Sequence, residues 1–92
     1  MELNHAVGAA LRELRITNGV SQEKVGASQS YVSDVERGFK SLSIDKLDEF
    51  ATNIGVHPLS ILAKAYLLKH EEISLSELIT RMEQDLNEAT GL

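Results

Sequence analysis

The sequence predicts an all-α fold, with five short helices in one domain and an amphipathic helix after them. Apolar residues recur every three or four positions along most of the chain, which is the period of a helix that buries one face. No stretch shows the strict apolar–polar alternation of a half-buried strand. Serine, glycine and proline stand where the helical pattern stops and starts again, as they do at helix ends.

The first predicted helix runs from about Leu3 to Asn18. Gly19 follows it, as glycine does just beyond a helix end. The expected apolar stripe of this helix consists of Leu3, Val7, Ala10, Leu11 and Leu14.

The second and third predicted helices are short and closely spaced. Ser21 is a suitable N-cap for a second helix of one turn. Ser28 caps a third helix that reaches about Arg37, and Val32 and Val35 mark its buried side.

The fourth predicted helix begins after Ser43 and ends at Gly55. Pro58 suits the first turn of a fifth helix, where its missing N–H costs no hydrogen bond. This helix, over residues 58–69, is apolar nearly all round. One face can therefore fill the core, while the opposite face needs a partner.

Ser74 and Glu77 form a capping box that opens a sixth helix. Its apolar stripe can fold back onto the core of the monomer or pair with a second subunit. Because the fifth helix is apolar on two sides, we favour pairing and expect a homodimer. The predicted dimer interface consists of Leu62, Tyr66, Leu75, Leu78, Ile79, Met82 and Leu86. The chain is thus divided into a domain over residues 1–70 and a C-terminal dimerisation helix over residues 71–92.

The composition is that of an ordinary soluble globular protein, with 42% apolar and 25% charged residues. Cysteine is absent, which excludes disulfides and thiolate metal sites. The N-terminal stretch carries charges through its apolar part, unlike a signal peptide. The most apolar stretch, residues 59–68, is too short to span a bilayer. We therefore expect a cytoplasmic protein.

The net charge of −5 argues at first against a nucleic-acid partner, but the charges are unevenly distributed. Residues 1–46 carry six cations and six anions, whereas residues 47–92 carry three cations and eight anions. The whole deficit lies in the second half, so the first half is free to meet a polyanion.

The third helix carries many short polar side chains on its outward side. These outward residues are Gln29, Ser30, Tyr31, Ser33, Asp34 and Arg37, with Gln29 and Tyr31 at the exposed N-terminal end. A solvated helix face is the simpler interpretation, although surface helices usually favour Glu, Lys and Ala over serine. Short side chains let a backbone approach another molecule closely, and Gln and Arg can make bidentate contacts with base edges. The pattern favours DNA reading without deciding it.

The stretch VSQEKVGASQSYVSDVERG (20–38) resembles the helix-turn-helix of the Cro/repressor-type (Xre-like) DNA-binding family. The matching segments are SQE (21–23), GAS (26–28), SYVS (30–33), VERG (35–38), LRELR (11–15) and residues 41–62. The resemblance covers about residues 3–68 and implies a five-helix, repressor-like domain. In one respect the chain differs, since family members usually have about four more residues in the second helix. Four residues are close to one turn, so the second helix is shortened without a rotation of the third.

The resemblance also implies roles in DNA binding. Gln22 would hydrogen-bond a phosphate at the start of the second helix. Gln29, Ser30 and Ser33 would read bases. The implied DNA-binding set is Gln22, Ser28, Gln29, Ser30, Tyr31, Ser33, Arg37, Lys40 and Ser41, of which Tyr31, Arg37, Lys40 and Ser41 lie on or near phosphates.

The same resemblance implies two further roles. Arg15 and Glu36 would form the buried structural ion pair of the family, tying the first helix to the end of the third. Asp34, an acid among phosphates, would accept from a cytosine amino group or lie just outside the groove.

We interpret the chain as a sequence-specific transcriptional regulator, a repressor or autorepressor that binds a pseudo-palindromic operator as a homodimer. One recognition helix covers few base pairs, and a dimer adds a second half-site. The alternatives are an antitoxin whose acidic C-terminal helix contacts a toxin, a controller of a restriction–modification operon, or a protein-interaction module with a degenerate helix-turn-helix. DNA binding that depends strongly on salt would separate the last of these from the others.

Catalysis and metal binding are not expected. The sequence has no nucleophile–base signature and no phosphate-binding loop. The three histidines, His5, His57 and His70, lack the spacing of metal ligands on a helix. We therefore predict no enzyme activity, no metal and no cofactor.

Overall fold

The computed structural model describes residues 1–26 and 28–90, which form six α-helices and no strand. The helices are α1 (Leu3–Thr17), α2 (Gln22–Val25), α3 (Gln29–Glu36), α4 (Ile44–Ile54), α5 (Pro58–Lys69) and α6 (Leu75–Thr90). The predicted all-α class is confirmed, and the helix bounds agree with the expected ones to within about a residue. Ala27, part of the matching GAS segment (26–28), lies outside the described residues, as do residues 91–92 of the predicted C-terminal segment.

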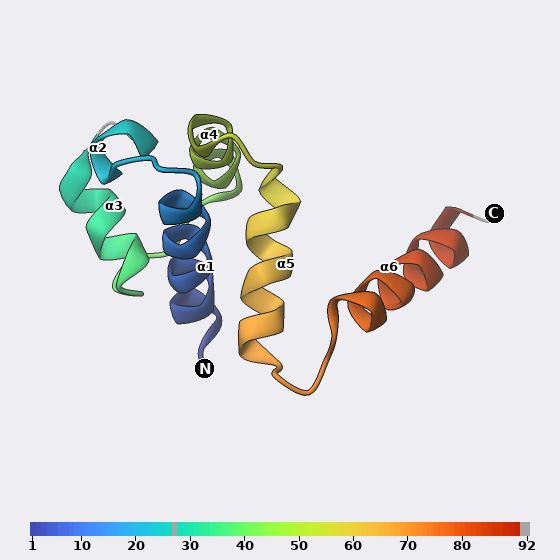
Figure 1. Cartoon of the computed structure of the whole chain (residues 1–92). Coiled ribbons are helices and arrows are strands. Elements are labelled where there is room, and N and C mark those ends of the chain that lie inside the picture. Colours follow the sequence, from blue (N-terminus) through green and yellow to red (C-terminus); the bar gives the residue numbers. More distant parts are fainter. Residues whose placement is uncertain (27, 91–92) are drawn as a thin grey trace.

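Helices α1 and α5 pack side by side in the middle of the molecule (Figure 1). Helix α3 packs against α1 and α2, and α4 contacts both α2 and α5. Helix α6 packs mainly against α5 and extends to the side, beyond the turn that follows α5 (Figure 1). None of the helices in the described part of the chain is both long and apolar enough to cross a membrane.

The core is built from the first five helices. Its largest fully buried side chains are Leu11, Val25, Val32, Val35, Phe50 and Ile61. Full burial of such a side chain contributes about 1.5–3 kcal/mol. The two valines predicted to mark the buried side of α3 are among them, so this part of the prediction is confirmed.

The stripe predicted for α1 is partly wrong. Leu3 is 38% exposed, whereas Ala6, which the stripe omitted, is fully buried with Ala10. The reason is that α1 lies between α3 and α5, and closely packed helices bury small residues on both sides.

Gly8 sets the distance between α1 and α3. A Cβ atom at this position would overlap the carbonyl oxygen of Val35 and would lie 2.8 Å from that of Glu36. Both obstacles are backbone atoms, which cannot turn away as a side chain can. Only glycine therefore lets α3 approach α1 this closely.

The predicted serine caps behave differently from one another. Ser43 Oγ accepts a hydrogen bond from the Lys46 backbone N–H at 3.1 Å. Ser74 and Glu77 form both bonds of the predicted capping box, at 3.1 and 3.2 Å. Ser21 stands at the N-cap of α2, but its side chain makes no capping hydrogen bond. Helix α2 is thus held by its neighbours rather than by its cap.

Candidate nucleic-acid interface

Helix α3 turns one face to the core and the other outward. Val32 and Val35 are 0% and 1% exposed, whereas Gln29 and Ser30 are exposed and Ser33 is half-buried. This alternation follows from the helical period, since valines three residues apart lie on the same side. The sequence-predicted reading residues therefore share one surface of one rigid element.

The N-terminus of α3 is fixed by hydrogen bonds among its first residues. Ser28 Oγ accepts from the Tyr31 backbone N–H at 3.3 Å and lies 3.1 Å from Ser30 Oγ. An N-cap of this kind typically contributes about 1 kcal/mol to helix stability. The cap fixes the start of α3, next to the exposed Gln29.

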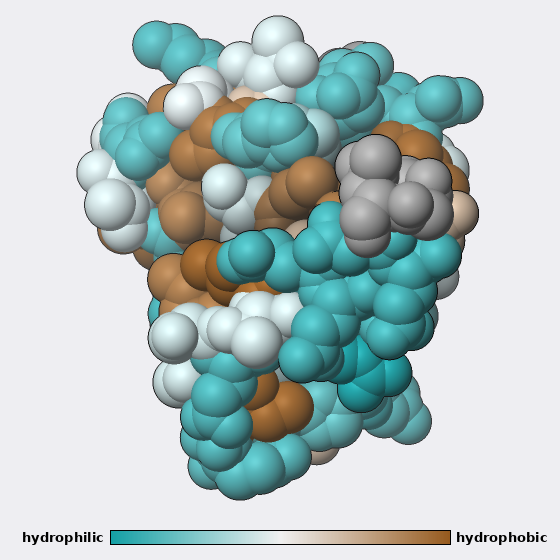
Figure 2. Space-filling view, turned by 90° about the vertical axis from the view of Figure 1, so that its right-hand side faces the viewer, coloured by the Kyte–Doolittle hydropathy of each residue, from teal (hydrophilic) through white to brown (hydrophobic). Residues whose placement is uncertain are grey.

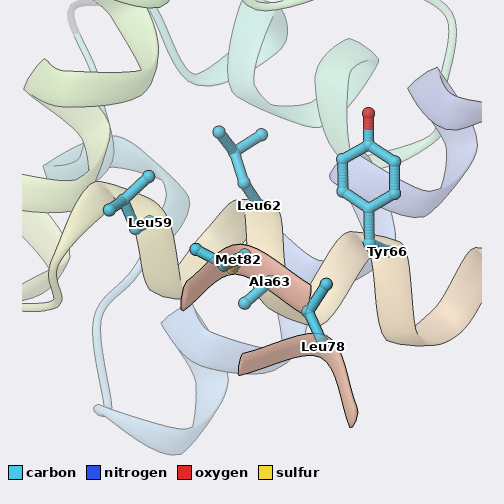
Figure 3. A pocket seen from close by; sticks show the side chains of 6 residues that line it. All are labelled: Leu59, Leu62, Ala63, Tyr66, Leu78 and Met82. Carbon is cyan, nitrogen blue, oxygen red and sulfur yellow. The ribbon is translucent and has the colours of Figure 1, made fainter. Parts of the chain in front are cut away.

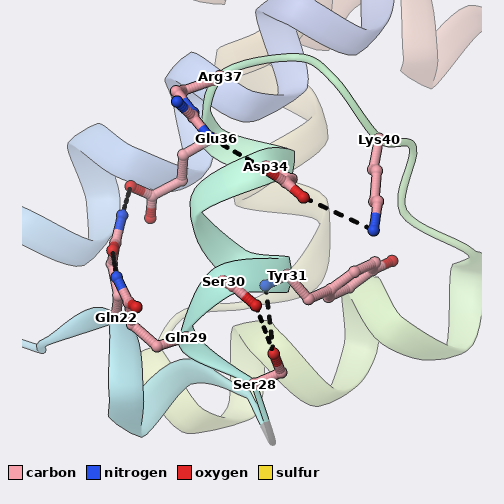
Figure 4. A network of polar contacts seen from close by, with 9 residues as sticks. All are labelled: Gln22, Ser28, Gln29, Ser30, Tyr31, Asp34, Glu36, Arg37 and Lys40. Atoms are coloured by element: carbon pink, nitrogen blue, oxygen red, sulfur yellow. Dashed lines mark hydrogen bonds and ion pairs between the residues drawn. The ribbon is translucent and has the colours of Figure 1, made fainter.

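A chain of hydrogen bonds links Gln29 to the interior (Figure 4). Gln29 Nε2 donates to Gln22 Oε1 at 2.6 Å, and Gln22 Nε2 donates to Glu36 Oε1 at 3.0 Å. The carboxylate of Glu36 in turn accepts from Arg15, through Nε at 2.6 Å and Nη2 at 3.0 Å. The Gln22 side chain, which is expected to contact a phosphate, thus also supports the Gln29 side chain, which is expected to read bases.

Arg15 and Glu36 form a buried ion pair, with side chains that are 12% and 2% exposed. A third hydrogen bond, from Arg15 Nη1 to the carbonyl of Val20 at 2.9 Å, fixes the guanidinium. The hydrogen bond to Glu36 raises the pKa of Arg15, against the opposing effect of burial. The pair joins α1 to the end of α3 and thereby fixes the orientation of the outward face.

Two cations lie at the C-cap of α3 and in the loop that follows it. Arg37 and Lys40 have side chains that are 61% and 54% exposed, and Ser41 is also exposed. Tyr31, expected at an exposed end, is instead half-buried, with its ring edge-on to Phe50 at 6.1 Å between centroids. Its hydroxyl donates to the carbonyl of Ser41 at 3.2 Å, which ties α3 to the loop before α4.

Arg12 belongs to the same surface, although we did not predict it from the sequence. With Gln22, Ser33, Glu36 and Arg37 it lines a hollow of about 340 Å³. Arg12 stands three residues before Arg15 on the same helix, so both lie on one face. That spacing was the sequence signal that could have placed Arg12 on this surface. The surface therefore holds three exposed arginine and lysine side chains around α3.

The residues predicted for a dimer interface lie on the opposite part of the molecule, along α5 and α6. A groove of about 290 Å³ is lined entirely by Leu59, Leu62, Ala63, Tyr66, Leu78 and Met82 (Figure 3). Brown apolar patches interrupt the hydrophilic surface on this side (Figure 2). Leu59, 54% exposed, was missed, although it stands three residues before Leu62.

The remaining predicted interface residues continue this apolar surface. Leu75 and Ile79 line an adjoining hollow of about 340 Å³, and Leu86 is 60% exposed further along α6. The structure thus brings Leu62, Tyr66, Leu78 and Met82 together. The other three predicted interface residues lie on α6, the helix that carries Leu78 and Met82. We call the surface formed by Leu59, Leu62, Tyr66, Leu78 and Met82 the α5–α6 groove.

Residues 11–61, more than half of the chain, match the family model for Helix-turn-helix. The chain belongs to this helix-turn-helix family. The match contains α2, α3 and the ion pair between α1 and α3. It confirms the predicted family and the predicted class of DNA-binding transcriptional regulator.

Several curated proteins are similar to the chain. The control protein C.BamHI of Bacillus amyloliquefaciens is 32% identical over 60% of this chain and 74% of its own. The immunity repressor protein of Bacillus phage phi105 is 27% identical over 100% of this chain and 69% of its own. An uncharacterised HTH-type transcriptional regulator of Sinorhizobium fredii is 37% identical over 61% and 78% of the two chains. No solved structure is significantly similar.

These relatives are named as regulators rather than enzymes. Within residues 1–26 and 28–90, no group of three or more His, Asp or Glu side chains is arranged to hold a metal ion.

Proposed function

We propose that the chain is a sequence-specific repressor whose helix α3 reads a pseudo-palindromic operator and whose α5–α6 groove joins two copies. The observation that carries the proposal is the outward face of α3, where short polar side chains lie between a capped N-terminus and a cationic C-terminal end. A face of this kind can enter a major groove without steric obstruction from long side chains.

Gln29 is the principal reading residue in this proposal. Its Nε2 donates one hydrogen bond to Gln22, which leaves a second N–H and the side-chain oxygen for a base. A glutamine amide presents a donor and an acceptor together, which matches the N7 and N6 edge of adenine. Ser30 and Ser33 allow close approach and add single hydrogen bonds.

Phosphate contacts supply most of the affinity. We assign them to Gln22, Tyr31, Arg37, Lys40 and Ser41, and add Arg12 because it lines the same hollow as Arg37. Each phosphate that a cation neutralises contributes about 0.9 to the slope of log affinity against log salt. Binding should therefore weaken steeply as salt rises.

The occupant proposed for the α5–α6 groove is a second copy of the chain. Leu75, Ile79 and Met82 are 52%, 46% and 39% exposed, which is unusual for an apolar stripe on one helix. Helix α6 also carries acidic side chains, which phosphates repel, so this side of the molecule is suited to face away from DNA. A two-fold dimer would set its recognition helices about 34 Å apart, one turn of DNA.

The division into a DNA-binding domain over residues 1–70 and a dimerisation helix over residues 71–92 is part of the proposal. So are the absence of catalytic activity and a location in the cytoplasm, where a bacterial or phage operator would be. Similarity to a protein named a control protein favours a second candidate, a regulator that controls an operon in either direction. A reporter gene behind the selected operator distinguishes repression from activation.

The reading role is tested by selecting bound duplexes from a random library and measuring affinity for the most enriched sequence. Gln29→Ala should weaken that binding by about 1–3 kcal/mol, or roughly 5- to 150-fold, and leave binding to a scrambled duplex nearly unchanged. Gln84→Ala, an exposed glutamine on α6, is the matched control. If Gln29→Ala binds the enriched duplex as well as the unaltered chain does, α3 does not read DNA through this residue.

The dimer is tested by sedimentation at micromolar concentration. Leu78→Asp places a charge in the α5–α6 groove and should give a monomer that binds operator duplex poorly. Thr80→Asp puts the same charge on the same helix outside the groove and should remain a dimer. Truncation after Glu72 should weaken the dimer while the helix-turn-helix stays folded. A clean monomer of the unaltered chain, with and without DNA, would contradict the dimer.

A further inference from the structure

Asp34 is an acid on the outward side of α3, in contact with two of the exposed cations. Its Oδ1 accepts from Arg37 Nη2 at 3.0 Å, and its Oδ2 lies 3.6 Å from Lys40 Nζ. The Asp34 side chain is 29% exposed, so it is better shielded from water than either cation. One carboxylate thus uses both oxygens to hold two cations (Figure 4).

Each of these cations also lies over an aromatic ring. The Arg37 guanidinium carbon is 4.9 Å from the centroid of Phe39, and Lys40 Nζ is 5.6 Å from that of Tyr31. Cations in this range are attracted to the ring face. Arg37 and Lys40 are therefore restrained from two directions, by Asp34 and by a ring.

An acid at this place should affect the two kinds of DNA binding to different extents. Binding to arbitrary sequences depends almost wholly on cations that neutralise phosphates, and a negative charge among those cations weakens it. Binding to an operator also uses base contacts, which require a fixed register rather than a high net charge. Cations already restrained in one geometry lose less freedom when they set that register.

We propose that Asp34 is a specificity-determining residue, which restrains Arg37 and Lys40 and suppresses phosphate binding at sequences that α3 does not read. The inference rests on the proposed DNA-binding function and deepens it. It gives the acid a role in discrimination and assigns it no contact with a base.

The experiment compares Asp34→Asn with the unaltered chain on the most enriched duplex and on a scrambled duplex of equal length, over a series of salt concentrations. Asp34→Asn should bind the scrambled duplex about fivefold more tightly, as expected for removing a unit charge near a phosphate in water. The salt slope should steepen by about 0.9, because removing the carboxylate leaves one more net positive charge to neutralise a phosphate. The enriched duplex should gain less, so the ratio of the two affinities should fall at least threefold.

The matched control is Asp85→Asn, which removes the same charge from an exposed pair with Arg81 on α6. It should leave both the affinity ratio and the salt slope unchanged. Asp34→Ser, a second variant without the charge, should reproduce the effect of Asp34→Asn, and thermal melting shows that each variant is folded.

Several results would overturn the inference. Equal tightening on both duplexes, or an equal effect of Asp85→Asn, would mean that only net charge matters. A tenfold or greater loss confined to the enriched duplex would mean that Asp34 contacts a base directly. If the unaltered chain binds no duplex in a salt-dependent way, the proposed function fails together with the inference, whereas salt-dependent binding with an unchanged ratio refutes the inference alone.

Discussion

Replacing Arg15 with alanine would leave Glu36 buried without a cation. The Glu36 side chain is 2% exposed, and within the described part of the chain only the hydrogen bond from Gln22 Nε2 would remain to its carboxylate. Breaking a buried pair from one side costs about 3–5 kcal/mol. A domain of this length has a total stability of roughly 5–14 kcal/mol. The variant should therefore lose a large share of its stability.

Thermal melting followed by circular dichroism measures this loss. Each kcal/mol lowers the Tm of a domain of this size by about 4–8 °C, so a decrease of at least roughly 12 °C is expected. The pKa of Arg15 is raised in the folded state. Its contribution is therefore complete below the unfolded-state pKa and is lost only as pH rises through the folded-state value, in strongly alkaline solution. Melts at neutral pH thus measure the full effect.

The control is Arg81→Ala, which breaks an ion pair on α6 whose side chains are 74% and 59% exposed. Exposed pairs of this kind contribute at most about 0.5 kcal/mol. Adding Glu36→Ala to Arg15→Ala should recover part of the lost stability, because no buried charge would remain. If Arg15→Ala melts within about 4 °C of the unaltered chain, the pair does not hold α1 and α3 together as argued.

Three further substitutions test the packing and the helix caps. Gly8→Ala should destabilise the fold by about 1–3 kcal/mol, because the added Cβ would overlap the Val35 and Glu36 carbonyls. Helix propensity alone would instead make alanine stabilising. The sign of the Tm change therefore shows which of the two effects is larger. Ser43→Ala should cost about 1 kcal/mol of stability, because it removes the capping hydrogen bond with the Lys46 backbone N–H. Ser21→Ala should cost only a few tenths of a kcal/mol, because the Ser21 side chain makes no capping bond at α2. Equal losses of stability in denaturant titrations would contradict this difference.

The helices could be predicted because each is specified locally. Ser43 and Gly55 bound α4 through a capping bond and a left-handed φ of 91°, both of which depend on residues a few positions away. The start of α6 is likewise specified locally, by its capping box. Such signals need no knowledge of the remaining chain.

The side-to-side placement of helices was harder to predict. Ala6 rather than Leu3 is buried because α1 has neighbours on two sides, and periodicity along one helix cannot show how many neighbours it has. Tyr31 is half-buried because Phe50, on α4, meets its ring. The pairing of Asp34 with two cations likewise depends on where the loop after α3 carries Lys40.

The hydrogen-bond chain from Arg15 to Gln29 explains how a helix α2 of only four residues can serve this fold. Gln22 and Val25, three residues apart, lie on the same side of one turn. Val25 is fully buried, and its carbonyl accepts from Asn53 Nδ2 of α4 at 2.7 Å, which anchors α2 to the core. Gln22 extends from that anchor to Glu36 on one side and Gln29 on the other. A single turn is therefore sufficient to join the core to the outward face of α3, and shortening Gln22 should loosen Gln29 without unfolding the domain.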